Sequence, residues 1–202
     1  MNNLSLRLNH ICVYLNNSII MNSKTPTFST TTITELMIPS YANFSGKIHG
    51  GILLSLMDKV AFACASKHSG EYCVTVSVEG VEFFQPVEVG ELVSLTGSVI
   101  YVGKTSMIVG IHIESMKPKT GETKHTNSCY FTMVAKNEEG EKTIVPSLNL
   151  ENINQLKRFV EGKEIKKFSR KKRKLLDMGI EAYNKEDLID ACKNERCDVT
   201  KI

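Results

Sequence analysis

Asp58 is the residue of this sequence whose surroundings most require a chemical explanation. It lies within residues 43–66, NFSGKIHGGILLSLMDKVAFACAS, and no other Asp or Glu occurs between Glu35 and Glu71. The residues around it, from 52 to 63, are apolar on nearly every side, which predicts a helix buried on most of its faces. Because burying an unpaired charge is costly, we expect this carboxylate to be paired, neutralised or used in catalysis. Lys59 or a backbone N–H group could be the partner.

A glycine-containing loop with further candidate site residues leads into this helix. Asn43 offers a side-chain amide, and Gly50 and Gly51 begin the apolar segment. A helix N-terminus presents unpaired N–H groups and the positive end of the macrodipole, so it can stabilise a developing negative charge. Glycines there let a bound group approach main chain that a Cβ would shield. His49 is a candidate base, but we favour a role in packing or orienting the loop, and Asn43 could simply cap it.

The rest of the chain must supply the elements that hold the helix and the loop. Residues 30–38 have the character of a strand that Pro39 ends, and a cation-then-glycine signal at residues 67–70 stops the helix. Four β-rich segments follow, with Gly80 a candidate bulge in the first: residues 72–84, 92–102, 107–113 and 128–135. Short turns between them favour antiparallel neighbours. The order predicts an α+β fold in which one curved antiparallel sheet of five to six strands wraps round a long central helix.

The two ends of the chain differ in composition from this central part. Residues 1–28 contain no acid and much Asn, Ser and Thr, so we expect a disordered leader; a transit peptide or a true start at Met21 are alternatives. Residues 29–147 form the expected domain. Residues 148–202 form an expected basic helical extension, with helices at 148–168 and 186–194.

Composition argues against several classes of protein. With 202 residues, 42% hydrophobic and 23% charged, the chain has the balance of an ordinary globular domain. The net charge is +3, and residues 151–202 carry 14 Lys/Arg against 10 Asp/Glu, so overall charge does not recruit a partner to the main domain. None of the six cysteines forms a CxxC pair, which favours free thiols in the cytoplasm over disulfides or a metal site. No apolar run reaches the length of a membrane span.

The pattern NxxGxxHGG at residues 43–51, followed by LMD at 56–58, resembles the acyl-CoA thioesterases of the hotdog superfamily. It is most similar to the acyl-CoA hydrolase branch, which includes YciA-like bacterial enzymes and animal cytosolic acyl-CoA thioester hydrolases. Residues 74–83 and the turns at 86–91 and 103–106 resemble that branch as well. The resemblance covers residues 30–147. It implies a hotdog fold, a homodimer whose sheets join, and assembly into a trimer of dimers as in many members.

The resemblance also implies an activity, the hydrolysis of an acyl-CoA thioester to a free carboxylic acid and CoA, with no further cofactor. The family's catalytic Asn and Asp correspond to Asn43 and Asp58. Asp58 would act as general base toward water or as nucleophile through an anhydride, and the sequence leaves both open. Gly50 and Gly51 would provide N–H groups for the oxyanion, and Asn43 would hold the water or the thioester oxygen.

Two segments are candidates for holding CoA. Residues 74–78, which include Val76 and Ser77, would offer a strand edge to the pantetheine amides, as in the family. A turn would offer N–H groups, hydroxyls and a cation to the phosphates; it consists of Gly103, Lys104, Thr105 and Ser106. The basic run at residues 163–174 is a solvated helix face, a contact for CoA phosphates, or a contact for nucleic acid or acidic membrane. With Phe168 as its single aromatic residue, it gives nucleic-acid stacking little support.

The spacing of Gly51 and Asp58 carries a consequence for assembly. Seven residues along one helix separate them by about 10 Å. That distance is too long for both residues to touch one carbonyl carbon. A site that uses both must therefore take the helix start from one protomer and Asp58 from its partner, so the dimer is obligatory for catalysis.

Other readings of the sequence remain open beside this one. The phenylacetate-type branch shares the HGG…D pattern and takes aryl thioesters, and a non-catalytic hotdog could sense acyl-CoA. Retention of both Asn43 and Asp58 speaks against the sensor. Ser55 is in no GxSxG elbow, which argues against a serine hydrolase. We expect His112 to be half-buried in a strand and Cys64 to belong to the core.

Overall fold

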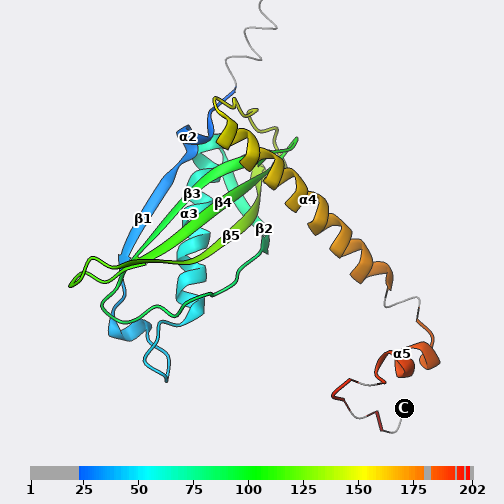
Figure 1. The fold of residues 1–202 in the computed structure, drawn as a ribbon. Coiled ribbons are helices and arrows are strands. Elements are labelled where there is room, and N and C mark those ends of the chain that lie inside the picture. Colours follow the sequence, from blue (N-terminus) through cyan, green and yellow to red (C-terminus); the bar gives the residue numbers. More distant parts are fainter. Residues whose placement is uncertain (1–22, 180–182, 194, 198, 201–202) are drawn as a thin grey trace, which may run out of the picture. The chain divides into compact units, whose positions relative to one another are not determined.

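The structure is a computed structural model that describes residues 23–179, 183–193, 195–197 and 199–200 (Figure 1). Its central elements are a helix with one buried face, α3 (Gly50–Ser69), and five strands: β1 (Thr31–Leu36), β2 (Tyr72–Glu79), β3 (Leu92–Val102), β4 (Ser106–Met116) and β5 (Thr123–Lys136). Within the described chain these strands form one antiparallel sheet in the order β1-β3-β4-β5-β2. The sheet curls round α3, which confirms the predicted α+β hotdog architecture.

Helix α3 begins and ends with residues suited to those positions. The His49 side chain caps the N-terminus, and no proline interrupts the helix. Gly70 ends it in the left-handed conformation, with φ +79°, and donates its N–H to the Ser66 carbonyl at 2.8 Å. Glycine is the residue that adopts this conformation without a Cβ clash. Lys67 in the last turn complements the negative end of the helix dipole, as the cation-then-glycine signal predicts.

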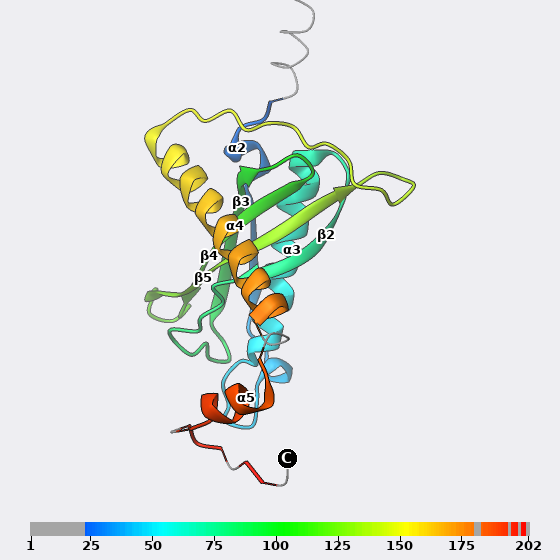
Figure 2. The ribbon, with the colours of Figure 1, turned by 90° about the vertical axis from the view of Figure 1, so that its right-hand side faces the viewer.

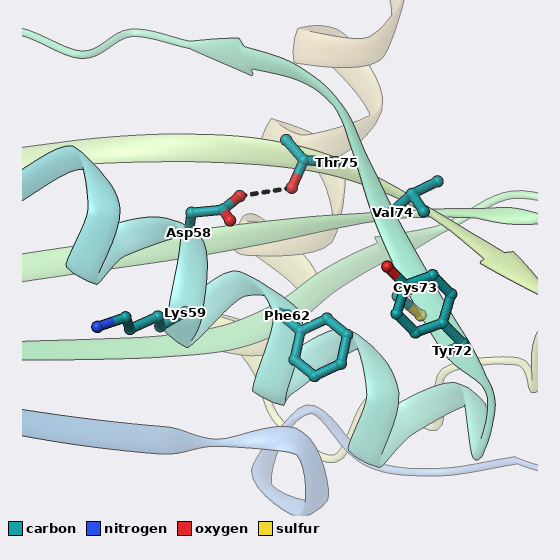
Figure 3. A pocket seen from close by; sticks show the side chains of 7 residues that line it. All are labelled: Asp58, Lys59, Phe62, Tyr72, Cys73, Val74 and Thr75. Atoms are coloured by element: carbon teal, nitrogen blue, oxygen red, sulfur yellow. Dashed lines mark hydrogen bonds between the residues drawn. The ribbon is translucent and has the colours of Figure 1, made fainter.

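One face of α3 is exposed, and here the prediction of a helix buried nearly all round is wrong. The exposed residues of this face follow helical spacing: Gly51, Leu54, Ser55, Asp58, Lys59 and Phe62. A single sheet can cover only part of a helix, so the remaining stripe is left uncovered in one protomer. Leu54 and Phe62 remain 39% and 41% exposed although both are apolar. Figure 3 shows Asp58, Lys59 and Phe62 along this stripe.

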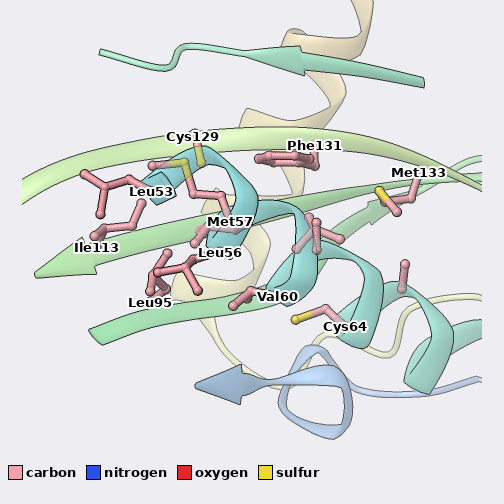
Figure 4. Close-up of a cluster of buried hydrophobic side chains, with 14 of the residues drawn as sticks. Leu53, Leu56, Met57, Val60, Cys64, Leu95, Ile113, Cys129, Phe131 and Met133 are labelled. Carbon is pink, nitrogen blue, oxygen red and sulfur yellow. The ribbon is translucent and has the colours of Figure 1, made fainter. Parts of the chain in front are cut away.

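The opposite face of α3 forms the core with the concave side of the sheet (Figure 4). The buried side chains come from α3 and from three strands: Leu53, Met57, Val60, Cys64, Leu95, Ile113, Phe131 and Met133. Cys64 is fully buried, as predicted. Gly97 on β3 is part of this fit, because a Cβ built there would stand 2.7 Å from Cγ1 of Val60. The absence of a side chain at Gly97 therefore sets how closely helix and strand approach.

The strand after α3 is shorter than the predicted segment 72–84. β2 ends at Glu79, and Gly80 follows with φ +65°, which takes the chain out of the extended conformation. Gly80 therefore ends the strand and is not its bulge. The irregularity in the β2–β5 register instead falls between Thr75 and Ser77. Residues 80–91 form a loop, which contacts β5 where the Phe84 N–H donates to the Thr126 carbonyl.

The chain preceding and following the sheet is also attached to it. Residues 1–22 of the expected leader lie outside the described residues, whereas α2 (Pro26–Ser29) is described, and the Lys24 N–H donates to the Ser147 carbonyl at 2.9 Å. The Ser29 hydroxyl is fully buried and accepts the Val99 N–H.

Helix α4 (Ile153–Gly179) begins later and ends later than the predicted helix at 148–168. Helix α5 (Lys185–Ala191) begins one residue before the predicted segment 186–194 and ends before that segment does. The chain divides into two compact units, residues 1–163 and 164–202. Within the first unit, the start of α4 packs on the outer face of the sheet (Figure 2). A Cβ on Gly162 would stand 2.7 Å from Cβ of Tyr101, so this glycine permits the close approach.

A partly buried hydrogen bond also attaches the first part of α4 to the sheet. The Tyr130 hydroxyl on β5 donates to the Glu161 carboxylate. Burial, together with this carboxylate, raises the pKa of Tyr130 to about 12, so the phenol keeps its proton and continues to donate. None of the helices in the described ranges has the length and apolar character needed to cross a membrane.

Candidate active site

The Asp58 carboxylate lies on the exposed stripe of α3 and faces strand β2 (Figure 3). Its Oδ1 accepts a hydrogen bond from the Thr75 hydroxyl at 2.6 Å. A short bond to a charged acceptor is stronger than a neutral one and fixes the orientation of the carboxylate. Asp58 is therefore held by a partner on another element, yet remains accessible to a ligand. Lys59, which the sequence offered as an alternative partner, forms no salt bridge with it among the described residues.

A pocket of about 370 Å³ lies in front of this pair, between α3 and the start of β2. Its lining combines the two polar groups with apolar and aromatic side chains: Asp58, Lys59, Phe62, Tyr72, Cys73, Val74 and Thr75. The rings of Phe62 and Tyr72 meet edge to face, with centroids 5.8 Å apart. A carboxylate beside an apolar wall suits a ligand that has one reactive polar group and an apolar body.

Strand β2 forms one edge of the sheet and carries two of the expected CoA-binding residues. Val76 lies at the register shift and is 55% exposed, and Ser77 pairs with Thr132 of β5. β5 pairs with one side of β2 and no other described strand pairs with the opposite side, which therefore presents backbone N–H and C=O groups. The expected edge for extended amide groups is therefore present beside the pocket.

The start of α3 is capped by its own loop. Nδ1 of His49 accepts the Gly51 N–H at 3.0 Å, which fixes the tautomer with Nδ1 unprotonated. This contact agrees with the expected role of His49 in orienting the loop. A Cβ at Gly50 would stand 3.2 Å from the Phe83 ring, so that ring covers one side of the helix start. The Gly50 N–H has no acceptor among the described residues, so it is the candidate donor to a ligand oxygen at this end of the helix.

Asn43 organises the loop ahead of the helix through its side-chain oxygen. Oδ1 accepts three hydrogen bonds, from the Ser45 N–H at 2.9 Å, the Ser45 hydroxyl at 2.7 Å and the Lys47 N–H at 3.2 Å. Asn43 therefore caps the loop, which is one of the two roles expected from the sequence. Its Nδ2 donates to no described residue, and Asn43 itself is exposed, so the amide hydrogens are available for a second role.

One protomer does not bring all the expected site residues together. The pocket at Asp58 contains neither Asn43 nor the helix-start glycines. The turn of Gly103, Lys104, Thr105 and Ser106 lies elsewhere: Ser106 pairs with Val134, which pairs with Val74, so this turn is near the end of the sheet where α3 ends. Helix start and turn are therefore at opposite ends of α3. In the single chain, the Asp58 pocket, the start of α3 and the turn at residues 103–106 are therefore three separate regions.

Sequence reasoning did not single out Thr75 or Phe83 as site residues. Thr75 belongs to a β-branched run, in which a threonine is expected for its strand propensity alone. Its contact with Asp58 depends on how β2 lies over α3, which the local sequence does not reveal. The signal for Phe83 is only that Phe83 and Phe84 follow the end of a strand. Both residues contact the site through segments distant in sequence, so local spacing could not reveal them.

Other candidates have no part in this site. His112 is exposed, contrary to the half-buried prediction, because it lies on the outer face of β4, where it stacks on His125 at 4.4 Å and contacts Glu114. In the described segments no group of three His, Cys, Asp or Glu side chains could hold a metal ion. The five cysteines that the structure describes are all free thiols: Cys64, Cys73, Cys129, Cys192 and Cys197.

A long helix in a curled five-stranded sheet, with a carboxylate on the helix, defines the class as a hotdog-fold protein. Comparison with known proteins agrees with that class. Residues 45–122 match the thioesterase superfamily. The chain is 45% identical over 124 residues to protein VdlD of Helicobacter pylori, covering 61% of this chain and 71% of that protein. It is 30% identical over 141 residues to the rat cytosolic acyl coenzyme A thioester hydrolase, which is 69% of this chain but 37% of that protein.

A solved structure gives the same result. An apo-hexameric acyl-CoA thioesterase superimposes with a TM-score of 0.71 at 34% identity, covering 76% of this chain and 98% of that chain. The chain therefore belongs to the thioesterase superfamily and, within it, to the hotdog-fold acyl-CoA hydrolases.

Proposed function

We propose that this protein hydrolyses acyl-CoA thioesters to a carboxylic acid and CoA. The observation that carries the proposal is the Asp58 carboxylate, oriented by Thr75 at 2.6 Å and accessible from a pocket with apolar walls. The names of the similar hydrolases support the same substrate class. The proposal extends to a place in fatty acid metabolism and to the cytoplasm, where free thiols such as those observed persist.

The proposed reaction divides the work between an acid side chain and a helix start. Asp58 removes a proton from water as general base, or attacks the thioester carbonyl as nucleophile; both remain compatible with its exposure. The Gly50 N–H and the dipole of α3 stabilise the oxyanion, and the Nδ2 hydrogens of Asn43 hold the water or thioester oxygen. Because His49 already engages the Gly51 N–H, Gly51 contributes by keeping the main chain accessible.

Two protomers are needed to assemble these parts. Gly51 and Asp58 are separated by about 10 Å on one helix. The surface around Asp58 exposes apolar side chains. They are Leu54 and Phe62 on α3, and Tyr72 and Val76 on the edge strand. Such a patch supports a dimer that joins the β2 edges and places the helix start of one protomer against Asp58 of the other. A trimer of such dimers is proposed on the likeness to the hexameric thioesterase.

The same dimer would present CoA with two contact regions. Val76 and Ser77 lie at the register shift of β2, and we propose that main-chain groups which pairing with the partner strand leaves free there bind the pantetheine amides. The turn of Gly103 to Ser106 lies beyond the start of β2, where Lys104 is exposed and can neutralise phosphate.

The direct test is the substitution Asp58→Asn. It keeps the shape of the side chain and a hydrogen-bond acceptor for Thr75 but removes the base, so we expect kcat to fall by about 10²–10⁴-fold with CoA binding retained. Thiol release from palmitoyl-, acetyl- and phenylacetyl-CoA measures the activity, and Glu138→Gln on an exposed turn is the matched control. Equal rates in D58N and wild type would exclude Asp58 from catalysis.

The same panel separates the rival functions. Release from phenylacetyl-CoA alone would assign the aryl-CoA branch. Binding of all three esters without release by the wild type would identify a sensor and would contradict the proposed hydrolysis.

A further inference from the structure

The second unit contains a helical segment with two contrasting faces, residues 164–179 of α4. It carries seven Lys/Arg against two Asp/Glu, a surplus of five positive charges in 16 residues. Lys167 pairs with Glu164 at 3.4 Å and Arg173 with Asp177 at 3.8 Å. Within the described chain no carboxylate lies within salt-bridge distance of Arg170, Lys171, Lys172 or Lys174. These cations are therefore available to an external partner.

The apolar residues of this segment gather on one side of the helix. At 100° per residue, four of them fall within an arc of about 100°: Ile165, Phe168, Leu175 and Leu176. Phe168, Leu175 and Leu176 are 65%, 63% and 57% exposed, which is unusual for large apolar side chains. Most of the basic residues occupy the opposite side, among them Lys167, Arg170 and Lys174. The segment is thus a basic amphipathic helix.

We propose that residues 164–179 bind the surface of an anionic phospholipid bilayer. An apolar stripe with flanking cations fits the boundary between acyl chains and acidic headgroups, and each basic residue there strengthens binding by about fivefold. Lys172 lies in the middle of the apolar arc. Its charge would disrupt the seam of a coiled coil, but its long stem lets the ammonium reach a headgroup.

Nucleic acid fits the same helix less well. Single-stranded nucleic acid is bound by cations interleaved with aromatic rings. The one aromatic residue here, Phe168, lies on the apolar side and away from the main group of cations. The inference does not depend on the proposed hydrolysis, since it uses only residues outside the catalytic pocket.

Vesicle sedimentation of the full-length protein tests the proposal. The probes are phosphatidylcholine vesicles and the same vesicles with about 30% phosphatidylserine. We expect binding to the anionic vesicles alone, weakened at about 0.5 M NaCl. The double variant K171E/K174E should bind at least tenfold more weakly. F168S/L175S should also lose binding, because both faces are required.

The matched control is K119E/K142E, which makes the same change of charge at exposed lysines of the first unit. It should bind like the wild type, and thermal unfolding and acyl-CoA hydrolysis should be unchanged in all three variants. Failure of the wild type to sediment, or equal losses in the control, would overturn the proposal. So would wild-type binding by F168S/L175S, or binding of an RNA homopolymer in place of vesicles. None of these outcomes bears on the hydrolase activity, which is measured separately.

Discussion

At the scale of single residues, the contact between Thr75 and Asp58 is the feature that makes the pocket specific. Thr75→Val removes the hydroxyl with little change in shape, so the carboxylate loses its 2.6 Å donor and its fixed orientation. We expect kcat to fall by about tenfold, as for loss of one hydrogen bond to a charged group, with KM little changed. Thr75→Ser keeps the donor and should restore most of the rate. Wild-type kcat in Thr75→Val would contradict a positioning role for Thr75.

His68 gives the fold a dependence on pH. It is fully buried, and its Nε2 contacts the Pro146 carbonyl at 2.9 Å. Burial lowers the pKa of His68 below its ordinary value, despite that carbonyl. The folded state therefore prefers neutral His68, and this contribution to stability is complete above the unfolded pKa and is lost as pH falls through the folded one.

The free energy of unfolding in urea should therefore decrease on acidification below about pH 6.5. His68→Gln keeps a donor for Pro146 but cannot titrate in this range, so its unfolding free energy should fall less steeply. Identical slopes in the two proteins would show that His68 is not responsible.

Residue identities predicted part of this site. Asp58 and the paired glycines were recognisable because an isolated acid and a glycine-broken helix start are unusual in an apolar segment, and Asn43 was recognisable from the resemblance of residues 43–51 to the acyl-CoA thioesterases. The exposure of Asp58 could not be predicted, because apolar residues on the same stripe, such as Leu54 and Phe62, are of the types expected in a core. Thr75 was missed because its partner is set by how β2 lies across α3, which is a tertiary property.

At the scale of elements, the fit of α3 into the sheet depends on Gly97. An alanine there would bring its Cβ to 2.7 Å from Val60 and 3.2 Å from the Cys64 sulfur. We expect Gly97→Ala to lower the free energy of unfolding by about 1–3 kcal/mol through overpacking. Val60→Ala creates the missing space, so the double variant should be less destabilised than the sum of the single variants. Urea titration of all four proteins checks this, and strict additivity would contradict the contact.

The types and approximate bounds of most helices and strands could be predicted from the sequence. β3 was predicted at its observed bounds because turns containing Gly90 and Gly103 flank a segment rich in β-branched residues. β2 was overextended, because residues 81–84 are as β-prone as the strand itself and only the positive φ of Gly80 separates them. The end of α4 was missed since its second half is basic and gains no support from a core.

At the scale of the whole molecule, the proposed active site requires two chains. The single protomer exposes an apolar stripe on α3 beside an unpaired strand edge, and it keeps Asp58 apart from Asn43 and Gly50. Sequence spacing predicted this separation, because helix geometry alone fixes the distance along α3. The number of subunits in any assembly larger than a dimer depends on surfaces that no local sequence pattern encodes.

Mixed dimers of two inactive variants test this requirement most directly. Asp58→Asn and Asn43→Ala are each expected to be nearly inactive alone. If each site takes Asp58 from one chain and Asn43 from the other, every mixed dimer has one intact site. Coexpression should then restore about a quarter of the wild-type rate per chain. Hydrolysis no faster than the mean of the two separate variants, in a preparation shown by mass to contain mixed dimers, would contradict a shared site.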